Sequence, residues 1–191
     1  MSDSLPQEIV KSADGENITV DEVTDRNVQL GVAYWRALCG GRRFPARTDL
    51  TLRAMTPFIS HVVILRVIDG GADYEYGFAG DAHIRAFKVP FKGIRVSQIE
   101  AAAPDFGKLL RAAYDRARSA ATPFAVRGRV DMGFGKATPH YHETAFLPLG
   151  DSDDAVDHLL IVGVQIPRPF WDITAQSIET IAGQLRGNPP A

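Results

Sequence analysis

Two short segments of this 191-residue chain, residues 62–68 and 159–166, are apolar at almost every position. Only Arg66 introduces a charge into the first segment. A β-strand that exposes one face to water alternates apolar and polar residues, whereas a strand covered on both faces does not. Both segments are therefore predicted to be central strands of a sheet with a layer of structure on either side. We expect the two strands to pair as neighbours.

The first apolar segment leads directly into a second strand. Residues 69–73 have the composition of a turn, and Tyr74, Tyr76 and Phe78 then alternate with small or polar residues. Successive side chains of a strand point to opposite faces, so the three aromatic rings share one face. Residues 61–80 are thus predicted to form a β-hairpin whose aromatic side chains pack into the core.

Helical periodicity occurs in both halves of the chain. Apolar residues at helical spacing run from a capping position at Thr24 or Asp25 to Gly40, and a longer amphipathic pattern begins at Pro104. The remaining patterns predict short helices and further strands. In chain order, the later elements are short helices at 49–55 and 82–87, the long helix at 104–122, strands at 124–132, 138–149 and 158–166, and a terminal helix at 172–185.

The order of these elements defines one α+β domain with an extension at each end. Hairpin strands come first, helices follow, and three more strands complete the sheet. A chain of this length can bury about 70% of its unfolded surface around a single core. The predicted parts are a flexible lead-in (1–22), an N-terminal helical extension (23–58), the core that contains the sheet (59–168) and a C-terminal helix and tail (169–191).

Composition and charge exclude several classes of partner. The formal net charge is −2, so the chain lacks the basic field that binds a phosphate backbone, and nucleic acid is not expected as a partner. Cys39 is the single cysteine, which excludes an internal disulfide and favours a reducing compartment. Because the chain has no signal-peptide pattern and no apolar run of about 20 residues, we expect a cytoplasmic protein without a membrane span.

Several short motifs follow one another along residues 28–167. They are Tyr34-Trp35 on the first helix, Pro45, Arg47 and Asp49 in a connector, Gly80 after the aromatic strand, the turn at 91–94 and the strand end at 147–149. In order and spacing, these residues resemble a bacterial family of single-domain PAS-like proteins. The resemblance implies a five-stranded antiparallel sheet with a small internal cavity. Short helices and one long helix would cover one face, and the N-terminal helix would lie on the other face or at a dimer interface.

The resemblance implies a non-enzymatic sensory or protein-interaction domain of signal transduction. Such a domain would bind a small-molecule ligand or a protein and pass a signal to a signalling partner in trans. Val28, Val32 and Trp35 lie on the apolar stripe of the first helix, so they are the candidate residues for a homodimer interface. A structural adaptor without a ligand is an alternative.

Six side chains on the elements expected to surround the cavity are candidate ligand contacts. They are His83, Phe87, Leu110, Tyr114, Phe124 and His142. The sequence does not identify the ligand, but it disfavours several PAS cofactors. A flavin photoadduct or a coumarate thioester needs a suitably placed cysteine, and Cys39 lies upstream in the first helix. Haem is disfavoured because residues 105–120 contain no histidine to ligate the iron.

The histidines provide an alternative hypothesis. His140 and His142 are two positions apart on one strand and share a face, but no third ligand accompanies them, so no metal site is predicted. A small-molecule enzyme could use His83, His140 or His142 as a general acid or base in a cavity. No nucleophile motif supports this class, and the long helix in the middle of the chain favours the PAS arrangement.

Overall fold

The two apolar segments pair at the centre of the sheet. The structure is a computed structural model that describes residues 12–131 and 139–167. In it, β2 (Val62–Ile68) runs antiparallel to β6 (His158–Pro167), with Leu65 opposite Leu159. Both of these leucines are fully buried. The predicted pairing of the two central strands is therefore confirmed.

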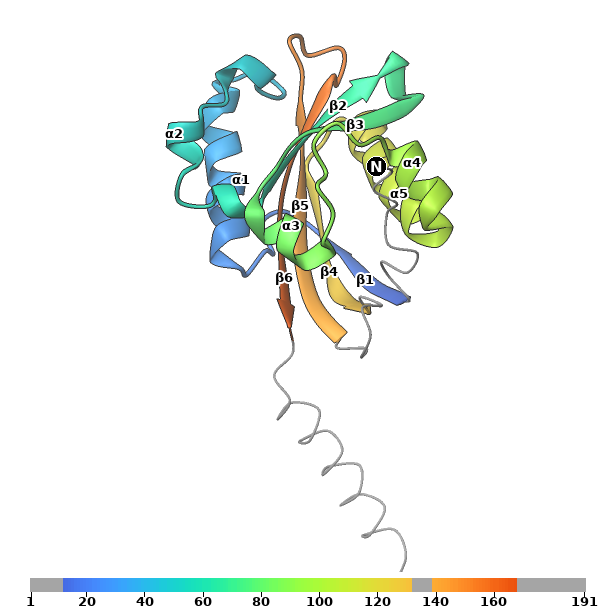
Figure 1. Ribbon diagram of the computed structural model, residues 1–191. Helices are drawn as coiled ribbons and strands as arrows, with labels where there is room; N and C mark the ends of the chain where they lie inside the picture. Colours follow the sequence, from blue (N-terminus) through green and yellow to red (C-terminus); the bar gives the residue numbers. More distant parts are fainter. Residues whose placement is uncertain (1–11, 132–138, 168–191) are drawn as a thin grey trace, which may run out of the picture.

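Within the described residues the sheet has six antiparallel strands in the order β1-β4-β5-β6-β2-β3, and helices lie on both of its faces (Figure 1). The other strands are β1 (Ser12–Ile18), β3 (Asp73–Ala79), β4 (Phe124–Asp131) and β5 (Pro139–Leu149). The helices are α1 (Arg26–Cys39), α2 (Leu52–Met55), α3 (Asp81–Phe87), α4 (Val96–Ala102) and α5 (Pro104–Ala120), with short 3-10 turns at Arg47–Asp49, Ile59–His61 and Asp69–Gly71. The α+β class is confirmed, and the predicted helix at 172–185 lies outside the described residues.

Strand β1 is absent from the sequence-based prediction. The sequence predicts five strands and a flexible lead-in over residues 1–22, but residues 12–18 pair with β4 in unbroken register. This pairing satisfies backbone donors and acceptors on the edge of β4. The five-stranded prediction is wrong because Ile18 is the one large apolar side chain in β1, so the segment has no alternating pattern.

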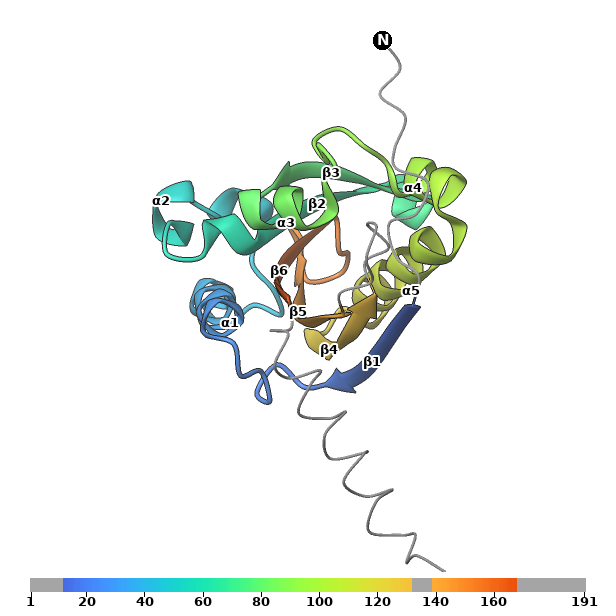
Figure 2. The ribbon, with the colours of Figure 1, turned by 60° about the horizontal axis from the view of Figure 1, so that its bottom comes forward.

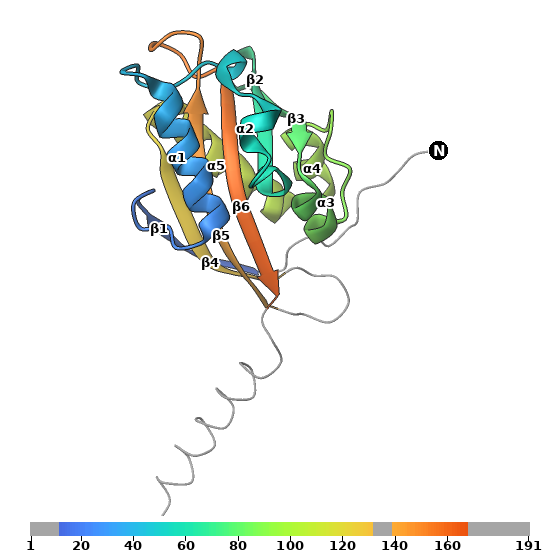
Figure 3. The same cartoon turned by 90° about the vertical axis from the view of Figure 1, so that its left-hand side faces the viewer.

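Helix α1 covers one face of the sheet, where it lies along β6 and β5 (Figure 3). Its boundaries follow the predicted signals. The Asp25 carboxylate accepts hydrogen bonds from two backbone amides of the first turn, and Gly40 ends the helix in the left-handed conformation. The indole Nε1 of Trp35 donates to the Pro148 carbonyl at 2.7 Å, which joins the helix to the end of β5.

The side chains predicted to form a dimer interface lie inside this chain. Val28, Val32 and Trp35 are buried and belong to the hydrophobic core. An apolar stripe that its own sheet covers needs no second subunit, so the structure corrects the assignment of these three residues to a dimer interface. The first helix was expected either on a face of the sheet or at a dimer interface, and it lies on a face of the sheet.

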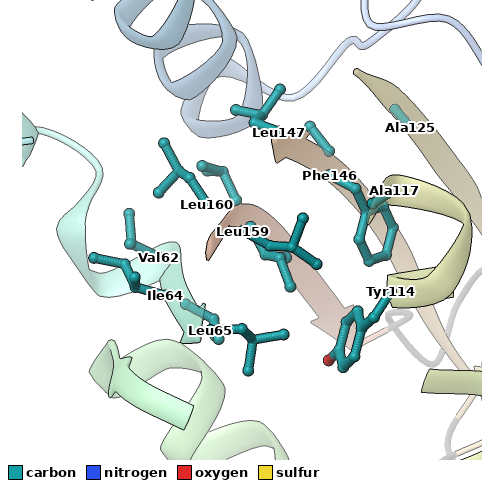
Figure 4. Packing of buried hydrophobic residues seen from close by; sticks show 14 of the residues in the cluster. Val62, Ile64, Leu65, Tyr114, Ala117, Ala125, Phe146, Leu147, Leu159 and Leu160 are labelled. Atoms are coloured by element: carbon teal, nitrogen blue, oxygen red, sulfur yellow. The ribbon is translucent and has the colours of Figure 1, made fainter. Parts of the chain in front are cut away.

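Helix α5 lies on the opposite face, packed against β5 and β6 and against the short α4. The sheet curves around the side that α5 occupies (Figure 2). Buried side chains form one cluster between these layers, with Leu147 and Leu160 toward α1, and with Phe146 and Tyr114 on the side of α5 (Figure 4). Each face of the central strands is thus covered by helices, as the apolar segments predict.

Two short helices begin at residues other than those predicted. Asp49 is predicted to start α2, but its carboxylate pairs with Arg42, and the Thr51 hydroxyl caps the helix instead. Gly80, rather than Asp81, occupies the N-cap of α3. In each case several neighbouring residues could cap the helix, and the backbone conformation determines which of them does.

The contact between α1 and β6 can be tested at Gly31. A Cβ built on Gly31 would lie 2.5 Å from Cγ2 of Val162. We expect Gly31→Ala to lower the free energy of unfolding by about 1–3 kcal/mol because overpacking displaces the helix, although alanine is the better helix former. Urea denaturation monitored by circular dichroism measures the change. The exposed Ala33→Gly is the propensity control, with an expected loss of about 1 kcal/mol. A Gly31→Ala protein as stable as the wild type would contradict this close packing.

Candidate functional site

A cavity of about 440 Å³ lies between the sheet and helices α3 and α5. This volume is within the range of about 300–1,000 Å³ that is typical of small-molecule sites. The lining is mainly aromatic and aliphatic, with a few polar groups among them. The polar side chains of the lining are those of Asn17, Tyr76, His83, Tyr114, Arg116, His142, Thr144 and Gln165.

All six side chains predicted as ligand contacts line this cavity. His83 and Phe87 reach it from α3, Leu110 and Tyr114 from α5, Phe124 from β4 and His142 from β5. The pairing of β4 with β5, and the packing of α5 on β5, bring these separated residues around one space. That they bind a ligand stays a prediction.

Several residues of the lining were not among the six predicted ligand contacts. Tyr76 of β3 was expected to pack in the core, and it is buried while also lining the cavity. Phe146 is four positions from His142 on β5, so strand alternation alone places both on the same face. Gln165 is a single polar side chain near the end of the apolar strand β6, and this break in the pattern is the signal that could have identified it.

Aromatic rings make up much of the cavity wall. Phe87 stacks on Phe106 with ring centroids 5.6 Å apart and meets Phe91 edge-on at 5.8 Å. On the sheet, Phe124 and Phe146 stack at 4.8 Å. Interlocked rings hold one another in place and present flat apolar surfaces. The wall therefore suits an apolar ligand with a planar or compact body.

Two tyrosine hydroxyls meet at the wall. The hydroxyl oxygens of Tyr76 and Tyr114 are 2.8 Å apart, and both side chains are buried. Burial raises the pKa of Tyr76 and that of Tyr114 well above the ordinary value, so both stay protonated at neutral pH. In this hydrogen bond one hydroxyl donates and the other accepts. The proton of the accepting hydroxyl then has no acceptor of its own among the described residues.

His83 is a buried neutral imidazole. Its Nε2 lies 3.0 Å from the backbone carbonyl of His61, so Nε2 carries the proton and donates it to that carbonyl. Burial lowers the pKa of His83 to about 4. The ring also lies parallel to Phe87 on the next turn of α3, with centroids 6.4 Å apart. His83 has no hydrogen bond to a carboxylate within the described part of the chain.

His142 and Gln165 place two unsatisfied polar atoms beside the cavity. The residues are direct partners across β5 and β6, and both line the cavity. Nε2 of His142 and Oε1 of Gln165 are buried without a hydrogen-bond partner among the described residues. Burial also lowers the pKa of His142, so the imidazole is neutral at neutral pH. The side chain of His140, the other histidine of this strand, is outside the part of the structure that is described.

The neighbouring residue on β5, Glu143, points to the opposite face and holds the start of α1. Its Oε1 accepts from the backbone amides of Thr24 and Asp25, both at 2.8 Å. Its Oε2 accepts from the hydroxyls of Thr24 and Tyr141 at 2.9 Å. The carboxylate is fully buried, and these four donors replace its hydration. One strand thus contacts the cavity and the first helix through adjacent residues.

Metal and thiol chemistry find no support in the described residues. No group of three or more His, Cys, Asp or Glu side chains is arranged there to hold a metal ion. Cys39 is at the end of α1 and does not line the cavity. Its thiol donates to the Trp35 carbonyl at 3.4 Å, and partial burial raises its pKa, which disfavours the reactive thiolate.

Comparisons with known proteins leave the family open. No protein-family model matches the chain, and no curated protein matches it. Among solved structures it resembles an RNA-binding light-oxygen-voltage receptor at 19% sequence identity, with a TM-score of 0.39. The alignment covers 92% of this chain and 44% of that one, so the chain spans less than half the length of the receptor.

Among residues 12–131 and 139–167, no helix has the length and apolar character needed to cross a membrane. The longest of these helices, α5, carries charged side chains along one side.

The burial of His83 predicts a pH dependence of stability. Its pKa is about 4 in the folded state and near 6.5 in the unfolded chain, so only the unfolded state binds a proton between these values. The free energy of unfolding should therefore fall as the pH drops from 6.5 to 4, by about 3 kcal/mol in total. Urea titrations at a series of pH values measure this loss.

The variant His83→Phe isolates the contribution of this group. Carboxylates and His142 also titrate in acid, but the difference between wild type and variant removes their share. We expect the pH dependence of the variant to be shallower by about 1 kcal/mol per pH unit within this window. Parallel curves for the two proteins would show that His83 is not buried in the neutral form.

The role of Glu143 can be tested by removing its acceptors. Glu143→Met leaves the amides of Thr24 and Asp25 without their partner, and we expect the free energy of unfolding to fall by about 2–3 kcal/mol. Glu143→Gln should cost less, because its amide oxygen still accepts from the backbone and its NH2 can donate to the Thr24 and Tyr141 hydroxyls. Equal stability of Glu143→Met and wild type in chemical denaturation would refute this anchoring role.

Proposed function

We propose that this chain is a PAS-type sensory domain that binds a small molecule in the cavity between the sheet and α5. The observation that carries the proposal is the cavity itself, which combines an aromatic wall with buried polar atoms that have no hydrogen-bond partner among the described residues. Unsatisfied buried polar groups are costly, so natural proteins retain few of them without a reason. A bound molecule that satisfies them gives such a reason.

The strand order supports this class of domain. When β1 is set aside, the remaining order is β4-β5-β6-β2-β3, so the first and last strands lie side by side at the centre. The helices between β3 and β4 lie on one face, and the N-terminal helix lies on the other. This is the arrangement that the PAS resemblance of the sequence implies.

The geometry favours binding over catalysis. An acid–base enzyme needs a titrating group with a positioned partner near its substrate. Nε2 of His83 is occupied by a backbone carbonyl, and burial keeps both His83 and His142 neutral. Neither histidine has a carboxylate hydrogen-bond partner in the described part of the chain. These features suit recognition of a ligand by fixed, neutral hydrogen-bonding groups.

A signal from the cavity has a physical route to the other face of the sheet. His142 lines the cavity, and the next residue, Glu143, holds the N-terminus of α1 through the amides of Thr24 and Asp25. A ligand that moves β5 therefore also moves the anchor of α1. We propose that α1 and its preceding segment present this change to a signalling partner in trans. A homodimer would have to use surfaces other than Val28, Val32 and Trp35.

Filling the cavity should abolish ligand binding without unfolding the domain. Ala113 of α5 lines the cavity, and Ala113→Phe would occupy part of its 440 Å³. Native mass spectrometry of the purified wild type is expected to show an additional mass that is released on denaturation, and the variant should lack it. Circular dichroism of the variant verifies that it is folded.

Ala101→Phe is the matched control, because Ala101 is exposed on α4 and does not line the cavity. This protein should retain the additional mass. A wild-type protein that carries no small molecule, and that no member of a compound library stabilises against heat, would contradict the proposed function.

A further inference from the structure

Two unsatisfied polar atoms next to the cavity come from directly opposed residues. His142 on β5 faces Gln165 on β6 in the antiparallel register, and side chains in this relation are about 5 Å apart at Cβ. Both residues line the cavity, and His142 Nε2 and Gln165 Oε1 are each buried without a partner among the described residues. The pair therefore forms a polar spot with unused hydrogen-bonding capacity on a wall that is mainly aromatic and aliphatic.

The chemistry of these two atoms limits what can bind them. Oε1 of Gln165 is a carbonyl oxygen and can only accept, so its partner must donate a hydrogen. The imidazole of His142 is neutral because it is buried, and its Nε2 can form one hydrogen bond as donor or acceptor. A hydroxyl group, which both donates and accepts, satisfies both atoms at once. A group that can only accept would leave Gln165 unsatisfied.

Charge around the cavity argues against an anion. Arg116 is the formally charged side chain among the described lining residues. Its guanidinium already donates to the Asn17 side chain and lies over the Phe124 ring, 4.0 Å from the centroid. A carboxylate at the polar spot would face the Gln165 oxygen in a buried setting without a cation of its own, which is unfavourable. A neutral ligand avoids this cost.

The apolar side chains of the lining determine what kind of ligand body fits the cavity. Phe87, Phe106, Phe124 and Phe146 present ring faces and edges to the cavity. These surfaces gain free energy from apolar contact, at roughly 25 cal/mol for each Å² removed from water. An aromatic or alicyclic body fits this wall better than a sugar or a chain of polar groups.

We propose that the cavity binds a neutral aromatic or alicyclic molecule whose hydroxyl group donates to Gln165 Oε1 and accepts a hydrogen bond from His142 Nε2. This inference rests on the proposed function, because it names the class of ligand that the sensory cavity takes. The aromatic wall supplies most of the affinity, and the His142–Gln165 pair selects molecules that carry a donor.

Three molecules with the same bicyclic body test the inference. The probes are 2-naphthol, which donates and accepts, 2-methoxynaphthalene, which accepts only, and 2-naphthoate, which is an anion at neutral pH. Isothermal titration calorimetry with the full-length protein gives their dissociation constants. We expect 2-naphthol to bind about 10-fold or more tightly than either of the other two, because they leave the Gln165 oxygen unpaired.

The variant Gln165→Met removes the acceptor while keeping the length of the side chain. The preference for 2-naphthol over 2-methoxynaphthalene should then fall to about 2-fold or less, with little change in the affinity for 2-methoxynaphthalene. Gln29→Met is the matched control, since it makes the same substitution at an exposed position of α1 that does not line the cavity, and it should leave the preference intact. The wild-type comparison of the three probes decides the matter even when the Gln165 variant is unstable.

The outcomes separate this inference from the proposed function. Equal binding of 2-naphthol and 2-methoxynaphthalene to the wild type, or a preference that persists in Gln165→Met, would overturn the recognition by a donor group and leave a ligand-binding cavity. Tighter binding of 2-naphthoate would overturn the neutral ligand. The absence of binding by all three probes at about 1 mM would overturn the inference, and the proposed function would fail separately if the wild type also carried no small molecule.

Discussion

The pairing of β2 with β6 determines where the helices of this domain have to pack. Both strands are apolar on both faces, so neither can lie at a surface without exposing a row of large side chains to water. The chain covers one face with α1 and the other with α5 and the short helices. On the side of α3 and α5, a cavity lined by aromatic and aliphatic side chains lies between the sheet and the helices. The candidate site thus lies in the layer that covers this face of the central strands.

Strand β5 connects the two sides of the sheet. Strand alternation sends His142 and Phe146 toward the cavity, and it sends Glu143 and Leu147 toward α1. The buried Glu143 carboxylate ties the first residues of the helix to this strand, while Nε2 of the His142 imidazole has no hydrogen-bond partner within residues 12–131 and 139–167. The two faces of β5 therefore differ in their hydrogen bonding. On the α1 face protein donors satisfy the Glu143 carboxylate, whereas on the cavity face the His142 imidazole can still hydrogen-bond to a ligand.

The strongly patterned elements could be predicted from sequence. The central strands, the hairpin, α1 with its cap at Asp25, and α5 from Pro104 all carry local signals that tertiary contacts reinforce. Strand β1 could not be predicted, because its place depends on the free edge of β4 and not on its own side chains. The dimer assignment of Trp35 was wrong for a related reason. An apolar stripe shows that a surface is covered, but it does not say what covers it.

The sequence alone predicts which segments are buried, which periodicity each one has, and which aromatic and histidine side chains a cavity could use. These properties are local, because they follow from the spacing of residues along one strand or helix. Tertiary contacts are needed to bring His142 opposite Gln165, to anchor α1 on Glu143 and to add β1 to the edge of the sheet. Register and the packing of distant segments are set by the sum of many weak contacts across the whole core. No single stretch of sequence contains that information.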